Sequence, residues 1–66
     1  MQTEIIEGTT PTGNKPRVLE AWLKDVNGEQ GLHLWIHAPG ATNVDGWEIR
    51  VTPGELRDAL QRLGVR

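Results

Sequence analysis

Glutamate and histidine side chains that could catalyse a reaction or bind a metal gather around one short segment, residues 32–38. The segment carries His33 and His37, and Glu20 and Glu48 lie in the segments before and after it. Paired histidines can ligate a metal ion, but four residues along an extended strand span about 13 Å, which is too far for both to bind one ion. We therefore predict no metal site and no cofactor, and we expect exposed histidines with no shared role.

Paired carboxylates are the second candidate for chemistry, because two of them can serve as general acid and general base. Glu20 and Glu48 are expected about 10 Å apart across the sheet, near the separation of an inverting carboxylate pair. An open sheet, however, gives them no cleft that excludes water. The chain also has no Ser, Cys or Tyr, so the usual covalent nucleophiles are absent. We predict that the protein is not an enzyme.

Three strands are expected to position these residues, over residues 17–26, 32–38 and 47–52. Residue types alternate in each segment as they do in a half-buried strand. Asn27-Gly28 favours a tight type I′ turn between the first two, because both central residues of that turn need a positive φ. The resulting register places apolar residues opposite one another on all three strands. The predicted apolar side of the sheet consists of Leu19, Ala21, Leu23, Leu32, Leu34, Ile36, Trp47, Ile49 and Val51.

A helix is predicted directly after the third strand. Thr52-Pro53-Gly54-Glu55 is a capping box, in which the Thr52 hydroxyl accepts from the Glu55 N–H and the Glu55 carboxylate accepts from the Thr52 N–H. An apolar stripe with helical spacing follows, and Gly64 is expected to end the helix. The stripe consists of Leu56, Ala59, Leu60 and Leu63.

These elements predict an α+β domain over residues 17–66. It is a three-stranded antiparallel β-meander with one C-terminal α-helix packed on one face, in the order β-β-β-α, and the core lies between the helix and the apolar side of the sheet. The preceding residues, 1–16, contain a turn-rich stretch without apolar periodicity and are predicted to be a flexible N-terminal arm. Alternatively, Ile5 and Ile6 form a short edge strand over residues 3–7.

The opposite side of the predicted sheet has no element left to cover it. Trp22 and Trp35 lie near its middle, and aromatic residues together with arginine are the types enriched at the centres of interfaces. The candidate binding residues on this side are Trp22, Trp35, His33, Arg50, Glu20, Glu48, Lys24 and His37. The alternative is that each tryptophan merely lies flat beneath its charged neighbours or beneath the N-terminal arm.

Length and composition limit the range of functions. A domain of 66 residues buries only about 60% of its unfolded surface, so it is marginal, and without cysteine it has no disulfide or thiolate zinc site to stabilise it. A second copy of the chain can supply the missing stabilisation. The N-terminal residues resemble neither a signal peptide nor an anchor, so we expect a soluble, cytoplasmic protein with no membrane partner.

The sequence therefore predicts a small protein–protein interaction module with an accessory, regulatory or inhibitory role. Its partner is expected to be a second copy of the chain, bound through the side of the sheet that carries Trp22 and Trp35.

Nucleic-acid binding through the same side is the alternative function. A three-stranded sheet followed by a helix resembles, in the order of its elements, the DNA-binding modules of plant transcription factors and of phage integrase arms. The resemblance implies that Trp22, Lys24 and Arg50 would face the major groove. Glu20 and Glu48 on the same side, together with a net charge of -2, disfavour contact with phosphates.

Overall fold

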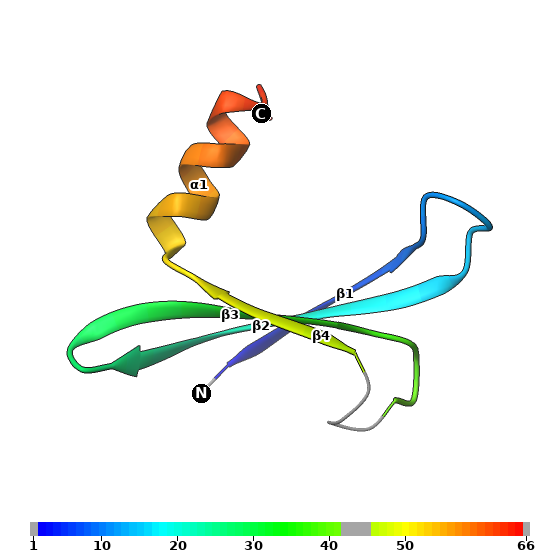
Figure 1. Cartoon of the computed structure of the whole chain (residues 1–66), viewed down its shortest axis with the longest axis horizontal. Coiled ribbons are helices and arrows are strands. Elements are labelled where there is room, and N and C mark those ends of the chain that lie inside the picture. Colours follow the sequence, from blue (N-terminus) through cyan, green and yellow to red (C-terminus); the bar gives the residue numbers. More distant parts are fainter. Residues whose placement is uncertain (1, 42–45, 66) are drawn as a thin grey trace.

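The computed structural model describes residues 2–41 and 46–65 and shows an antiparallel sheet followed by one helix (Figure 1). The strands lie side by side in chain order. Their bounds are β1 (Thr3–Thr9), β2 (Pro16–Val26), β3 (Glu29–His37) and β4 (Trp47–Val51), and the helix is α1 (Pro53–Arg62). The predicted α+β class is confirmed. Within the described part of the chain, no helix is long and apolar enough to cross a membrane.

The sheet has four strands where three were predicted. The additional strand, β1, occupies the segment predicted as a flexible arm and extends the alternative edge strand over residues 3–7 by two residues. A turn joins it to β2, in which Gly13 and Asn14 both have positive φ and the Thr10 N–H donates to the Lys15 carbonyl at 2.8 Å. Because every residue of β1 is exposed, its sequence shows no alternation that would reveal the strand.

The hairpin between β2 and β3 has the predicted register. Asn27 and Gly28 have φ angles of 53° and 82°, which confirms the expected positive values, and Val26 lies opposite Glu29. Apolar residues oppose one another in three cross-strand rows through β2, β3 and β4, which are Leu19–Ile36–Trp47, Ala21–Leu34–Ile49 and Leu23–Leu32–Val51. On β1, Ile6 lies opposite Leu19 and extends the first of these rows to a fourth strand.

The helix has the predicted caps at both ends. At the N-terminus the Glu55 N–H donates to Thr52 Oγ1 at 3.2 Å, and the Thr52 N–H donates to Glu55 Oε1 at 3.0 Å, which completes the capping box. At the C-terminus Gly64 has a φ of 83°, and the Val65 N–H donates to the Leu60 carbonyl at 3.1 Å. This is the hydrogen bond of a Schellman motif.

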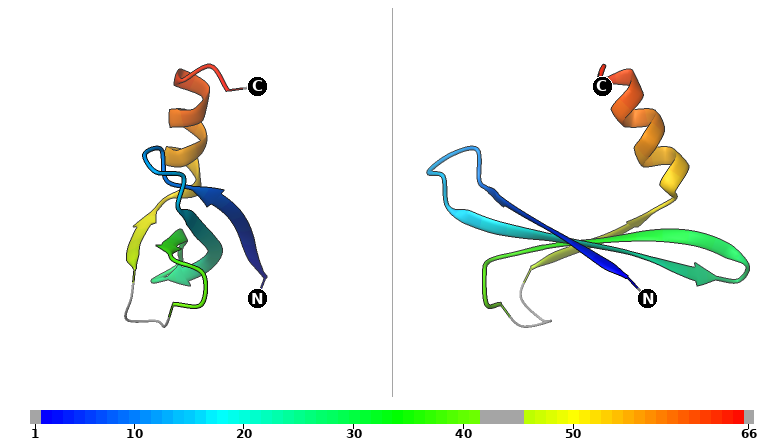
Figure 2. Two further views of the ribbon diagram at one scale, coloured as in Figure 1. Left: turned by 90° about the vertical axis from the view of Figure 1, so that its right-hand side faces the viewer. Right: turned by 180° about the vertical axis from the view of Figure 1, so that it is seen from behind.

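The helix does not pack on a face of the sheet, which corrects the predicted arrangement. In Figure 1 and in both views of Figure 2, α1 projects away from the sheet, and among the strands it approaches β3. No residue of α1 is fully buried. Thr52 alone separates β4 from α1.

The predicted core is consequently open to solvent. Among the described residues none of the hydrophobic side chains is buried, and Ile36, Ile49 and Trp47 are 47%, 57% and 83% exposed. Among the described residues the apolar pattern forms a surface on the sheet whose members are half-buried or exposed, and none is fully buried.

We expect acid to weaken the start of α1. The Thr52 backbone N–H, and then the Thr52 hydroxyl, donate to the Glu55 carboxylate and hold its pKa below the usual value of 4.5. A carboxyl with a lowered pKa in the folded state stabilises that state above its usual pKa, and this contribution is lost as the pH falls through the lowered value. Circular dichroism should show helical signal decreasing below about pH 4.5.

The variant Glu55→Gln is the matched control for this titration. Glutamine keeps the capping geometry but has no proton to gain, so its helical signal should not respond to this acid step. The same acid dependence in both proteins would contradict the assignment to Glu55.

Candidate functional site

The predicted candidate residues do lie on one side of the sheet, which we call the tryptophan face. The pairings place Trp22, His33 and Arg50 in one cross-strand row, and Glu20, Trp35 and Glu48 in the next. The tryptophan face is defined by Glu20, Trp22, Lys24, His33, Trp35, His37, Glu48 and Arg50.

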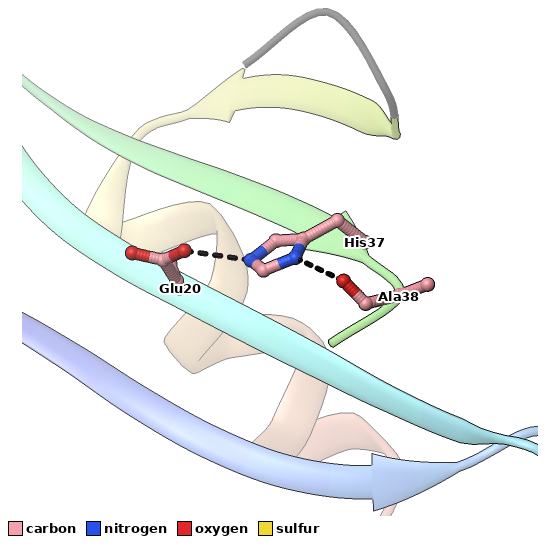
Figure 3. Close-up of polar contacts among 3 residues, drawn as sticks. All are labelled: Glu20, His37 and Ala38. Carbon is pink, nitrogen blue, oxygen red and sulfur yellow. Dashed lines mark hydrogen bonds and ion pairs between the residues drawn. The ribbon is translucent and has the colours of Figure 1, made fainter. Parts of the chain in front are cut away.

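The strongest polar contact on the tryptophan face joins Glu20 on β2 to His37 at the end of β3 (Figure 3). His37 Nε2 lies 2.6 Å from Glu20 Oε2, and His37 Nδ1 lies 2.8 Å from the carbonyl oxygen of Ala38. The His37 side chain is only 8% exposed, which makes it the most enclosed polar group among the described residues. The contact anchors the end of β3 to β2.

Both partners of His37 are hydrogen-bond acceptors when Glu20 is ionised. A carbonyl oxygen and a carboxylate can only accept, so both ring nitrogens must donate for the two hydrogen bonds to exist together. That is the imidazolium form, and the pair is then a charge-assisted hydrogen bond. In that form the contact between His37 and Glu20 is an ion pair, and neither ring nitrogen is free to accept a proton or bind a metal ion.

The tryptophans of this face are covered by their own neighbours. The Trp22 ring stacks on His33 with centroids 5.5 Å apart, and the Trp35 ring lies against His37 with centroids 3.9 Å apart. Both tryptophans are half-buried, although they were predicted to be exposed. The structure thus agrees with the alternative in which each indole lies flat beneath neighbouring side chains, and the neighbours are histidines of the same sheet.

The two histidines are directed to different carboxylates. His33 Nδ1 lies 3.7 Å from Glu48 Oε1, which is within ion-pair distance, whereas His37 binds Glu20. His33 Nε2 is buried and has no hydrogen-bond partner. Over the described ranges, no three His, Asp or Glu side chains come close enough together to hold a metal ion.

The remaining two members of the face are its basic residues. Arg50 lies over Gly31, where an added Cβ would come within 3.0 Å of the Arg50 Cδ atom. Lys24 lies on β2, opposite Gly31 of β3, and its side chain is exposed. Lys24 and Arg50, the two basic side chains of the tryptophan face, therefore lie at one end of it, and Glu20 and Glu48 lie towards the other end.

Replacing Gly46 with alanine should destabilise this arrangement. Gly46 has a φ of 127°, and a Cβ there would lie 2.6 Å from both Trp35 Nε1 and the Ile36 carbonyl oxygen. Strain of this kind costs about 1–3 kcal/mol, which urea denaturation can measure. Gly8→Ala is the matched control, because nothing lies within 4 Å of its added methyl group. Equal stability of the two variants would show that Gly46 is not a close-contact position.

The opposite side of the sheet, which we call the apolar face, is the more exposed of the two. It is defined by Ile6, Leu19, Ala21, Leu23, Leu32, Leu34, Ile36, Trp47, Ile49 and Val51. The stripe on α1 is half-buried at Leu56 and Ala59 and exposed at its C-terminal end, where Leu60 is 41% and Leu63 is 79% exposed. One chain thus presents two apolar surfaces, one on the sheet and one on the helix.

Sequence reasoning placed every candidate residue on its correct side of the sheet but missed two features. It did not find the pairing of His37 with Glu20, because these residues are diagonal neighbours and only the side-chain conformation brings them together. It also treated the apolar face as an internal core. Comparison with protein-family models, with curated proteins and with solved structures finds no match for this chain.

Proposed function

We propose that the chain is a non-enzymatic protein–protein interaction module that self-associates through its apolar face. The single observation that carries this proposal is the exposure of that face. Large apolar surfaces are rare on monomeric proteins, and where they occur they are typical of interfaces.

The exposed area has the size that a stable dimer needs. The chain exposes 5586 Å² to solvent, whereas a compact monomer of 7.3 kDa exposes about 4,200 Å². The excess, summed over the polar and apolar surface of the whole chain, is roughly 1,400 Å², and a stable interface buries about 800 Å² per partner, with larger areas in obligate homodimers. A second copy of the chain can therefore supply the buried core that one copy lacks.

Self-association through the tryptophan face stays a prediction, and the geometry supports it less well. Trp22 and Trp35 are half-buried against histidines, and Glu20 is already bound to His37. The large apolar side chain that is most exposed on this side of the sheet is Ile5, which lies opposite Glu20 and is 60% exposed. The apolar face has Ile49 and Trp47 largely in solvent.

A module of this kind has an accessory or regulatory role, since its chemistry is recognition. The absence of cysteine favours a reducing compartment such as the cytoplasm. The nearest competing function is nucleic-acid binding through the tryptophan face, where Lys24 and Arg50 would contact phosphates.

Light scattering of the wild type and of Trp35→Ala tests the proposal at low and at moderate salt. We expect both proteins to have the mass of a dimer at both salt concentrations, because an apolar interface is insensitive to ionic screening. Circular dichroism confirms that each is folded. A Trp35→Ala variant that is folded but monomeric would show that the dimer interface lies on the tryptophan face.

A titration with duplex DNA discriminates the competing function. Phosphate contacts would give an affinity that falls steeply as the salt concentration rises. We expect no such binding. Salt-sensitive binding that is lost in Lys24→Ala would favour nucleic-acid recognition.

A further inference from the structure

Two apolar surfaces of the same chain, the apolar face of the sheet and the stripe on α1, leave large side chains exposed in the structure, among them Ile36, Ile49 and Leu63. The stripe on α1 has the spacing of a helix that packs on a sheet, and the apolar face is the sheet surface that such a helix would cover. The helix begins directly after Thr52 and projects away from the sheet, as Figure 1 shows. Each surface therefore needs a partner outside its own chain.

We infer that α1 of each copy lies across the apolar face of the other copy in a symmetric dimer. This arrangement is called the helix exchange below, and it rests on the proposed self-association. The amino-acid pattern predicts a helix packed on a sheet. In the helix exchange this packing forms between two chains instead of within one chain.

The dimensions of the two surfaces match. A helix of ten residues is about 15 Å long, and four strands at their usual spacing span about 14 Å. One helix can therefore cross the full width of the sheet, from β4 to β1. The apolar face widens to the fourth strand because Ile6 continues the row that contains Leu19 and Ile36.

The helix exchange covers more apolar surface than packing the two sheets against each other. Sheets in direct contact would bury Ile36 and Ile49 but would leave Leu60 and Leu63 on α1 in solvent. In the helix exchange the stripe of each copy and the apolar face of each copy are buried in one interface. Two-fold symmetry repeats every contact, so no surface is left to recruit a third chain.

Cross-linking between single-cysteine variants tests this arrangement, because the chain has no cysteine of its own. Ile36→Cys places a thiol on the apolar face, and Leu60→Cys places one on the helix stripe. The two variants are mixed, unfolded and refolded together, and treated with a short bismaleimide. Lys24→Cys, at an exposed position on the tryptophan face, replaces Ile36→Cys in the matched control mixture. Mass spectrometry identifies the linked residues, and light scattering gives the mass before treatment.

The helix exchange predicts that Ile36→Cys links to Leu60→Cys between chains, and that the Lys24→Cys mixture gives at least tenfold less product. A dimeric protein in which Ile36→Cys links only to itself has its sheets face to face, which overturns the helix exchange and leaves the self-association intact. A monomeric mass overturns both. A chain carrying both cysteines that links internally at monomeric mass shows that α1 covers its own sheet, which also overturns both.

Discussion

Replacing Ile36 with glutamate should turn a folded dimer into a monomer that no longer unfolds cooperatively. Ile36 is 47% exposed in the single chain, so a carboxylate there would remain hydrated and cost little if the chain acted alone. In a dimer that covers the apolar face the carboxylate must be buried without a partner, which costs several kcal/mol for each copy. The dimer dissociation constant should therefore rise by at least about a thousandfold.

Thr3→Glu is the matched control for this substitution. It adds the same charge, but Thr3 pairs with Trp22 and lies on the exposed edge strand of the opposite side. We expect this variant to keep the mass and the unfolding cooperativity of the wild type. Sedimentation and urea denaturation measure the two properties. If Ile36→Glu behaved like Thr3→Glu, the apolar face would be a free surface.

Dilution should lower the melting temperature of the wild type. A chain that folds only with its partner loses stability as its concentration falls, and a hundredfold dilution removes about 2.7 kcal/mol per dimer. For a dimer of this size the melting temperature should decrease by about 10 °C. Circular dichroism in cells of different path length measures the change. A melting temperature that does not depend on concentration would mean that a single chain is stable alone.

The register and the helix caps could be predicted because their signals are local. Asn27-Gly28 fixes the hairpin turn, and the apolar residues on one side of β2 then meet the apolar residues on the same side of β3, in the pairs Leu19–Ile36, Ala21–Leu34 and Leu23–Leu32. The capping box and Gly64 mark the two ends of α1 by hydrogen bonds within one turn. Each of these features depends on residues that are close along the chain.

Strand β1 could not be predicted with the same certainty. Its two isoleucines are adjacent and therefore lie on opposite sides of the sheet, where Ile5 pairs with Glu20 and Ile6 with Leu19. The strand is stabilised by backbone pairing at the edge of β2, and backbone pairing leaves no pattern in the side chains. The Gly13-Asn14 turn was the available local signal, since both residues adopt positive φ.

For the candidate site, what the sequence could predict was limited for a different reason. Alternation assigned Trp22 and Trp35 to one side of the sheet, but it could not show that His33 and His37 would cover their rings. Equally, an apolar pattern shows which residues avoid water without showing which chain covers them. In the structure α1 begins directly after Thr52 and projects away from the sheet, an arrangement that the apolar pattern does not indicate.

Sedimentation equilibrium of the wild-type chain at micromolar concentration tests the central claim most directly. A dimer that buries its apolar face has twice the mass of the 7.3 kDa chain, and this is the result we predict. A folded, cooperatively melting protein of 7.3 kDa would contradict the account, because the apolar face would then be stable in water without a partner.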